Sequence, residues 1–134
     1  MKIILYVEDN AVVVQTYRAA LLRAGFQVDV AEDGLTAAKM LFKSKPDLVL
    51  LDLMLPRLSG TDVIKYIRST PELKSTLVII LSDASKADLA REAIELGVEK
   101  VFLKSQCTPA TLIGAINELL DGAAPGGPAQ PPAA

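Results

Sequence analysis

Residues 46–52 read Pro-Asp-Leu-Val-Leu-Leu-Asp, and this stretch decides the fold. Pro46 ends the helical segment before it, because proline lacks the amide hydrogen that a continuing helix needs. Residues 48–51 are apolar without alternation, which is typical of a strand buried on both faces of a parallel sheet. The strand stops at Asp52, and in open α/β sheets ligands bind beyond the carboxyl ends of the strands. The sequence thus predicts a central strand that delivers one carboxylate to the binding edge of a sheet.

The rest of the chain repeats this alternation of buried strand and amphipathic helix. Apolar runs predict further strands at residues 3–7, 26–31, 77–81 and 101–103. Asn10 and Thr108 are expected to cap the first and last of five helices. The residues expected to face the sheet from the helices are Val14, Tyr17 and Leu21; Leu35, Ala38 and Phe42; Val63, Ile64 and Ile67; Leu89, Ala93 and Leu96; and Leu112, Ile116 and Leu119. This alternation predicts a doubly wound α/β fold, with a five-stranded parallel sheet and helices on both faces.

The chain of 134 residues is predicted to hold one domain, at residues 1–121. Residues 122–134 carry no charge and consist mainly of Pro, Gly and Ala, which is typical of a linker or tail. The formal net charge of −2 gives no indication of nucleic acid as a direct partner, and no apolar run is long enough to span a membrane. The single Cys107 fits a reducing compartment, so we expect a cytoplasmic protein.

The absence of histidine removes the Ser/His and Cys/His arrangements of hydrolases and the commonest zinc ligands. What remains is a set of side chains at the predicted strand ends, namely Glu8, Asp9, Asp52, Ser82 and Lys104. Converging carboxylates repel one another, and a hard divalent cation such as Mg²⁺ relieves that repulsion. A lysine and a hydroxyl beside them suit a phosphoryl group, and a carboxylate on the central strand is placed to accept it.

These residues and their spacing resemble the receiver domain of bacterial two-component response regulators, over roughly residues 2–121. The resemblance implies a flavodoxin-like (βα)5 fold with strand order 2-1-3-4-5. It rests on seven features in the family's order: the acidic pair Glu8-Asp9, the acceptor-like Asp52, Pro56 and Gly60 in the following loop, Ser82, the aromatic Phe102, and Lys104.

The resemblance also implies a metal site and a phospho-acceptor. Mg²⁺ would be held by Asp9 and Asp52, by Glu8 through water, and by the backbone carbonyl of Met54. A sensor histidine kinase or a phosphotransfer protein would donate a phosphoryl group to Asp52. The only chemistry expected of the chain is its own phosphorylation and dephosphorylation, so it is not expected to be an enzyme acting on other substrates.

The signalling role is likewise implied by the resemblance. Ser82 and Lys104 would bind the phosphate oxygens, and Phe102 would turn inward as Ser82 moves. The face built from the fourth helix, the last strand and the fifth helix would then change. That face would signal to a downstream effector protein, or to a domain beyond the linker, and homodimers formed through it are common in the family.

The sequence departs from the family pattern at three positions. Asp83 replaces a usually small residue, and its carboxylate is predicted to slow phosphorylation unless it only caps the next helix. Ser105 replaces a common cis proline after Lys104, so we expect a trans peptide bond there. Met54 offers no polar side chain to orient an attacking water, which predicts a long-lived phosphoryl-aspartate.

Each site residue taken singly has an ordinary structural explanation, such as Glu8-Asp9 at the positive end of a helix dipole. Three other functions compete with the phospho-acceptor interpretation of the whole set. A docking module without phosphorylation would lack metal ligands, and none is missing. A Mg²⁺-dependent phosphohydrolase of the haloacid-dehalogenase type would place a second acid where Met54 stands. A flavodoxin-like cofactor binder would need a Gly- or Ser/Thr-rich phosphate loop after the first strand, where this chain is acidic.

Overall fold

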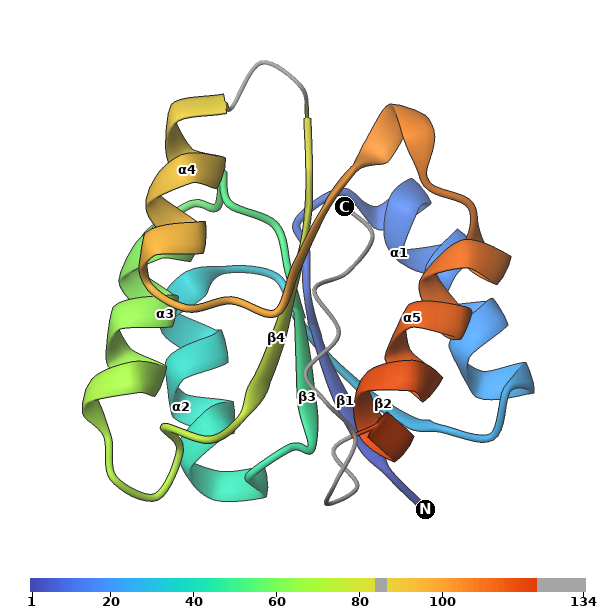
Figure 1. Cartoon of the computed structure of the whole chain (residues 1–134), viewed down its shortest axis with the longest axis horizontal. Helices are drawn as coiled ribbons and strands as arrows, with labels where there is room; N and C mark the ends of the chain where they lie inside the picture. Colours follow the sequence, from blue (N-terminus) through green and yellow to red (C-terminus); the bar gives the residue numbers. More distant parts are fainter. Residues whose placement is uncertain (84–86, 123–134) are drawn as a thin grey trace.

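Five parallel strands form the centre of the molecule, in the order β2-β1-β3-β4-β5 (Figure 1). The computed structural model describes residues 1–83 and 87–122, so the predicted linker lies outside the described residues apart from Gly122. The predicted doubly wound fold and strand order are confirmed. The strands are β1 (Ile3–Val7), β2 (Gln27–Ala31), β3 (Leu48–Leu51), β4 (Leu77–Ser82) and β5 (Lys100–Leu103).

Helices cover both faces of this sheet. Figure 1 shows α2, α3 and α4 on one side and α1 and α5 on the other. Within residues 1–83 and 87–122, no helix has the length and apolar character needed to cross a membrane. The helices are α1 (Ala11–Arg23), α2 (Gly34–Ser44), α3 (Gly60–Ser69), α4 (Ala87–Glu95) and α5 (Pro109–Gly122), and a short 3-10 helix, η2 (Lys104–Gln106), follows β5.

The sheet separates two hydrophobic cores. Side chains alternate along a strand, so Leu5 and Val7 of β1 enter the core under α2, α3 and α4. Ile4 and Tyr6 of the same strand enter the core under α1 and α5. Every residue of β3 is fully buried, as its unbroken apolar run predicted. Burial on both faces fixes the position of this strand, and with it the position of Asp52 at its end.

Side-chain caps fix where several of the helices begin. Oδ1 of Asn10 accepts hydrogen bonds from the backbone N–H groups of Val12 and Val13, at 3.0 and 3.2 Å. Oγ1 of Thr108 accepts one from the N–H of Thr111 at 3.1 Å. Both predicted caps are therefore confirmed, and each satisfies amide groups that have no partner inside the helix.

The predicted inward face of α2 was wrong at two positions. Leu35 is 39% exposed and Phe42 is 57% exposed, whereas Ala37 and Leu41 are fully buried. The rotation of the helix follows from its first turn, because Gly34 lies directly against the backbone of Leu58. A Cβ atom at Gly34 would lie 1.9 Å from the carbonyl oxygen of Leu58. This close approach fixes the rotation of α2, so that Ala37 and Leu41 face the core in place of Leu35 and Phe42.

Arg68, near the end of α3, joins the loop between α3 and β4 to the loop between α4 and β5, at the edge of the sheet opposite the strand carboxyl ends. Its guanidinium donates to the carbonyl oxygens of Lys74 and Thr76 at 2.9 and 2.7 Å. It also donates to the carbonyl oxygen of Gly97 at 2.8 Å and to Oε1 of Glu99 at 3.3 Å. Arginine suits this position because its planar fork of donors can satisfy several acceptors at once.

Candidate functional site: an acidic cluster with a lysine

The carboxyl ends of three parallel strands, β1, β3 and β5, bring the predicted charged residues together. Glu8 follows β1, Asp52 follows β3, and Lys104 follows β5. Carboxylate oxygens of Glu8, Asp9 and Asp52 lie within 4.8 Å of one another. The Nζ atom of Lys104 lies 2.9 Å from Oε1 of Glu8 and 3.4 Å from Oδ2 of Asp52. The parallel sheet therefore gathers an acidic cluster (Glu8, Asp9, Asp52) and one ammonium group at a single point.

Burial dominates the electrostatics of the acidic cluster. Glu8 is 1% exposed and Asp52 is 6% exposed, while Asp9 is exposed. Loss of solvation raises the pKa of the Glu8 and Asp52 carboxyls, although Lys104 opposes the shift at both. Burial alone would lower the pKa of the Lys104 ammonium. The carboxylates of Glu8 and Asp52 outweigh that effect, and the pKa is raised. Three negative charges thus face one positive charge.

The donor set of the acidic cluster fits a hard divalent cation. Oε1 of Glu8 is buried, and the ammonium of Lys104, at 2.9 Å, is its close charged partner. One ammonium group cannot neutralise three carboxylates that lie this close together, so their mutual repulsion carries a free-energy cost. Carboxylate oxygens are the ligands that Mg²⁺ prefers, and a charge of +2 would balance the excess of acid over ammonium.

The loop between β3 and α3 is held close to Asp52. The backbone N–H of Met54 donates to Oδ1 of Asp52 at 3.3 Å, and the Met54 side chain is 49% exposed. Gly60 lies against this turn, and a Cβ atom there would approach the carbonyl oxygen of Asp52 to 2.6 Å. Arg57 has a φ of 72°, the left-handed region that arginine rarely adopts, and its guanidinium contacts Asp33 at 3.3 Å. Nothing in the sequence around Arg57 indicated that conformation.

The other predicted residues, Ser82 and Phe102, lie on β4 and β5. Ser82 ends β4 and is 1% exposed, and among residues 1–83 and 87–122 its hydroxyl makes only a long 3.5 Å contact, to the carbonyl oxygen of Asp83. Asp83 is exposed, and its expected role as a helix cap depends on residues 84–86, which lie outside the described part of the chain. Phe102 is half-buried on β5 and packs against the core under α1 and α5. Their proposed roles in phosphorylation stay predictions.

The loop after Lys104 has the expected trans peptide bond at Ser105. It continues as the 3-10 helix η2 and reaches the half-buried Cys107, whose carbonyl oxygen accepts a hydrogen bond of 3.0 Å from the hydroxyl of Tyr17. Sequence reasoning placed Tyr17 on the inward face of α1 but missed this contact. Residues 90 positions apart carry no local signal of pairing.

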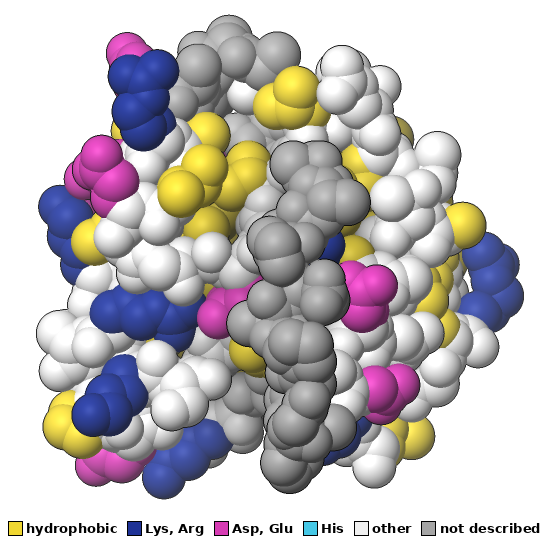
Figure 2. Space-filling model, in the orientation of Figure 1, with side chains coloured by type: hydrophobic (Ala, Val, Ile, Leu, Met, Phe, Trp, Pro, Cys, Tyr) yellow, Lys and Arg dark blue, Asp and Glu magenta, His cyan; other side chains and the backbone are white. Residues whose placement is uncertain are grey.

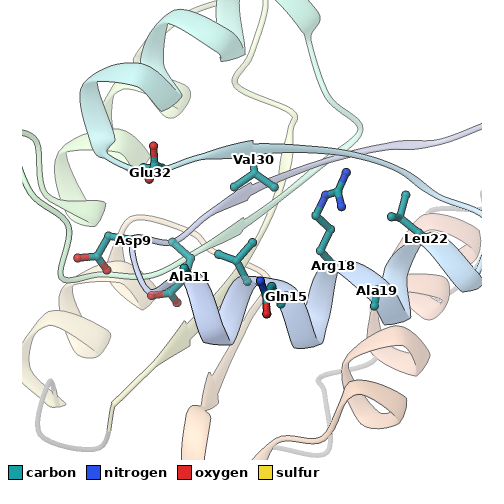
Figure 3. A pocket seen from close by; sticks show the side chains of 10 residues that line it. Asp9, Ala11, Gln15, Arg18, Ala19, Leu22, Val30 and Glu32 are labelled. Atoms are coloured by element: carbon teal, nitrogen blue, oxygen red, sulfur yellow. The ribbon is translucent and has the colours of Figure 1, made fainter.

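A groove of about 580 Å³ runs beside the acidic cluster, between α1 and β2. Figure 3 shows Asp9 at one end and Leu22 at the other, with Arg18 reaching across from α1. The groove therefore begins at an acid of the cluster and continues along a largely apolar floor. The residues that line it are Glu8, Asp9, Ala11, Val14, Gln15, Arg18, Ala19, Leu22, Val30 and Glu32.

The fold is a doubly wound α/β domain with acids and a lysine at the carboxyl edge of its parallel sheet. The family model described as the response regulator receiver domain matches residues 4–117. The chain therefore belongs to the response regulator receiver domain family.

Individual relatives agree with this assignment. The response regulator MprA of Mycobacterium sp. (strain KMS) is 37% identical over 81 residues, and the one from Mycobacterium leprae (strain TN) is equally similar. The match covers 60% of this chain and 35% of the length of the first of these relatives, so the chain spans only part of them.

Solved structures share the fold over most of the chain. The receiver domain of a Luxo repressor protein from Vibrio parahaemolyticus has a TM-score of 0.82 at 30% identity, covering 91% of this chain and 92% of its own. The receiver domain of a histidine kinase from Syntrophus aciditrophicus has a TM-score of 0.84 at 25% identity, covering 93% and 94%. The Mn²⁺-bound response regulator Rcp1 has a TM-score of 0.76 at 27% identity, covering 90% and 94%.

Proposed function

We propose that this receiver domain accepts a phosphoryl group on Asp52 in a Mg²⁺-dependent transfer from a partner histidine kinase. The observation that carries the proposal is the position of the Asp52 carboxylate. It lies at the end of the fully buried β3, 3.4 Å from the Lys104 ammonium and inside the acidic cluster. A carboxylate in this setting can serve as a nucleophile towards phosphorus once its negative neighbours are neutralised.

In the proposed transfer, an Asp52 oxygen forms a bond to phosphorus while the phosphorus–nitrogen bond of a phosphohistidine breaks. The product is an acyl phosphate on Asp52 and a free histidine on the donor. Asp9, Asp52, Glu8 through water, and the carbonyl of Met54 would hold Mg²⁺, which supplies neutralising charge when bound. Lys104 would stabilise the phosphate oxygens, because its ammonium already faces the acceptor carboxylate.

Ser82 and Phe102 would couple phosphorylation to a change of surface. Ser82 is buried at the end of β4, and its hydroxyl makes just one long contact with the described residues, so it could bind a phosphate oxygen. Its neighbour across the ladder between β4 and β5 is Leu103, which directly follows Phe102. Movement of Ser82 would therefore reach Phe102 and the surface formed by α4, β5 and α5, to which an effector protein or a domain beyond the linker would bind.

Protein partners suit the surface better than nucleic acid. Figure 2 shows acidic and basic side chains interspersed on one face, in keeping with 14 basic and 16 acidic residues in the whole chain. A kinase or phosphotransfer protein, an effector, and a second copy of the chain are the proposed partners, in a cytoplasmic setting. The Mn²⁺-bound state of Rcp1 supports the proposal of a divalent cation in the acidic cluster.

The test is the intact mass of the protein after incubation with acetyl phosphate and Mg²⁺. The wild type should gain one phosphoryl group, and neither Asp52→Asn nor the wild type in excess EDTA should gain any. No gain by the wild type, with Mg²⁺ binding confirmed separately, would leave either a docking module or a receiver closed to small donors. Transfer from a phosphorylated histidine kinase would then decide between these two.

A further inference from the structure

Lys104 begins a short loop whose next two side chains are exposed to solvent. Ser105 and Gln106 are exposed, and η2 is only three residues long. The peptide bond after Lys104 is trans, and the family's common proline is replaced by Ser105. The Lys104 ammonium must nevertheless stay within ion-pair distance of both Glu8 and Asp52. Some contact from outside the loop has to restrain it.

Tyr17 of α1 provides such a contact. Its hydroxyl donates to the carbonyl oxygen of Cys107 at 3.0 Å, three residues after Lys104. The Tyr17 side chain is 7% exposed, and burial raises the pKa of its hydroxyl, so the donor keeps its proton at neutral pH. A buried hydrogen bond to a backbone carbonyl restrains the loop more firmly than a side chain in solvent would.

The Tyr17 ring packs in turn against the ring of Tyr6. It meets the ring of Tyr6 edge to face, with centroids 6.4 Å apart and planes at 77°. Tyr6 is 1% exposed and lies on β1, two residues before Glu8. Phe102 and Cys107 pack against the same core as the two tyrosines. The chain of contacts thus runs from the central sheet, through two aromatic rings, to the backbone that carries Lys104.

We propose that Tyr17 is a positioning residue for phosphoryl transfer, which holds the Lys104 loop through the Cys107 carbonyl. The proposal rests on the proposed function, since it assigns Tyr17 a role in phosphorylation of Asp52. It goes beyond that function because Tyr17 lies outside the acidic cluster and touches neither donor nor acceptor.

Loss of the Tyr17 hydrogen bond is expected to affect phosphorylation of Asp52 and binding of Mg²⁺ differently. The Lys104 ammonium and a divalent cation both draw on oxygens of Glu8 and Asp52, and two cations at one site repel each other. A loosened Lys104 would therefore stabilise the transferring phosphoryl group less well, while competing less with Mg²⁺. General loosening of the fold would weaken both phosphorylation and Mg²⁺ binding.

The test compares Tyr17→Phe with the wild type. This change removes one oxygen and keeps the ring against Tyr6. The matched control is Tyr66→Phe on α3, which removes a hydroxyl from the opposite face of the sheet, where it makes no hydrogen bond among the described residues. Mg²⁺ dissociation constants are measured by calorimetry, and phosphorylation rates with acetyl phosphate at saturating Mg²⁺ for each variant.

We expect Tyr17→Phe to be phosphorylated about fivefold more slowly, the effect of one buried hydrogen bond, with Mg²⁺ bound as tightly as in the wild type or more tightly. Tyr66→Phe should match the wild type in both. A rate reduced less than threefold, or weaker Mg²⁺ binding alongside a slower rate, would overturn the positioning role.

A second readout separates this proposal from the proposed function. The ¹⁵Nζ resonance of Lys104 reports its ion pairs without any phosphorylation. It should be resolved in the wild type and broadened or lost in Tyr17→Phe, and an unchanged resonance would overturn the proposal. A wild type that gains no phosphoryl group from acetyl phosphate or from a phosphorylated histidine kinase would contradict the proposed function, while the resonance would still test how Tyr17 holds Lys104.

Discussion

Replacing Asp52 by asparagine is expected to stabilise the metal-free protein, although it removes the proposed phospho-acceptor. Asp52 is 6% exposed and shares a small volume with two other acids. Its pKa is raised by burial, which Lys104 only partly offsets. The raised pKa means that the folded protein disfavours the charge of Asp52 relative to the unfolded chain. A neutral amide of nearly the same shape removes that penalty.

The magnitude follows from the distances in the acidic cluster. At an effective dielectric constant of about 20, two carboxylate charges at 4.8 Å, the largest separation in the acidic cluster, repel by about 3.5 kcal/mol. The Lys104 ammonium at 3.4 Å attracts Asp52 by about 5 kcal/mol on the same scale. Solvent screens the exposed Asp9, so these terms nearly cancel, and the desolvation penalty of a few kcal/mol decides the sign. We expect a net gain of about 1–2 kcal/mol in the free energy of unfolding.

The assay is urea unfolding of the wild type and Asp52→Asn at pH 7.5, in EDTA and in saturating Mg²⁺. In EDTA the variant should be the more stable. Mg²⁺ at 100 times its dissociation constant should stabilise the wild type by about 2.7 kcal/mol, and the variant by less, which narrows or reverses the difference. An Asp52→Asn protein that is less stable than the wild type in EDTA would refute this electrostatic reasoning.

The pH dependence of stability gives an independent check that the charge of Asp52 destabilises the metal-free protein. A carboxyl with a raised pKa imposes no penalty on folding below its ordinary pKa of about 4, because it is protonated in both states. The penalty grows as the pH rises through the raised pKa of the folded protein. The difference in stability between Asp52→Asn and the wild type should therefore shrink as the pH is lowered towards 4. A stability difference that widened as the pH was lowered would contradict the raised pKa of Asp52.

Three further predictions concern positions outside the acceptor. Arg68→Ala should lower the free energy of unfolding by about 3 kcal/mol in urea titrations, because four acceptors lose a charged donor, and Arg68→Lys should restore less than half of the loss. Gly34→Ala should cost about 3 kcal/mol or more by the same measurement, since its Cβ atom would overlap the Leu58 carbonyl, and a Tm equal to that of the wild type would contradict this packing. Asp83→Ala should raise the rate of phosphorylation by acetyl phosphate at saturating Mg²⁺ if its carboxylate repels the donor, and an unchanged rate would remove that role.

The fold could be predicted because its strands carry a strong local signal. The run at residues 48–51 is apolar throughout, and only burial on both faces explains such a strand in a folded chain. The parallel arrangement then places the strand ends at one edge, which is why Glu8, Asp52 and Lys104 could be expected together. The caps at Asn10 and Thr108 were equally local, since each bonds amides two or three residues away.

What the sequence did not reveal depends on contacts between distant segments. The rotation of α2 was set by Gly34 against Leu58, and apolar periodicity alone favoured the exposed Leu35 and Phe42. Arg68 has the appearance of a solvated helix residue until the loops it joins are in place. The Tyr17 hydroxyl bonds a carbonyl 90 residues away, for which no spacing rule exists.

The most direct test of the account is the site at which the phosphoryl group is attached. The protein is incubated with acetyl phosphate and Mg²⁺, the acyl phosphate is trapped by reduction with borohydride, and peptides are analysed by mass spectrometry. The account predicts that the modified residue is Asp52, converted to homoserine, with Glu8 and Asp9 unchanged. Modification at Glu8 or Asp9, or a phosphorylated protein in which Asp52 is intact, would contradict it.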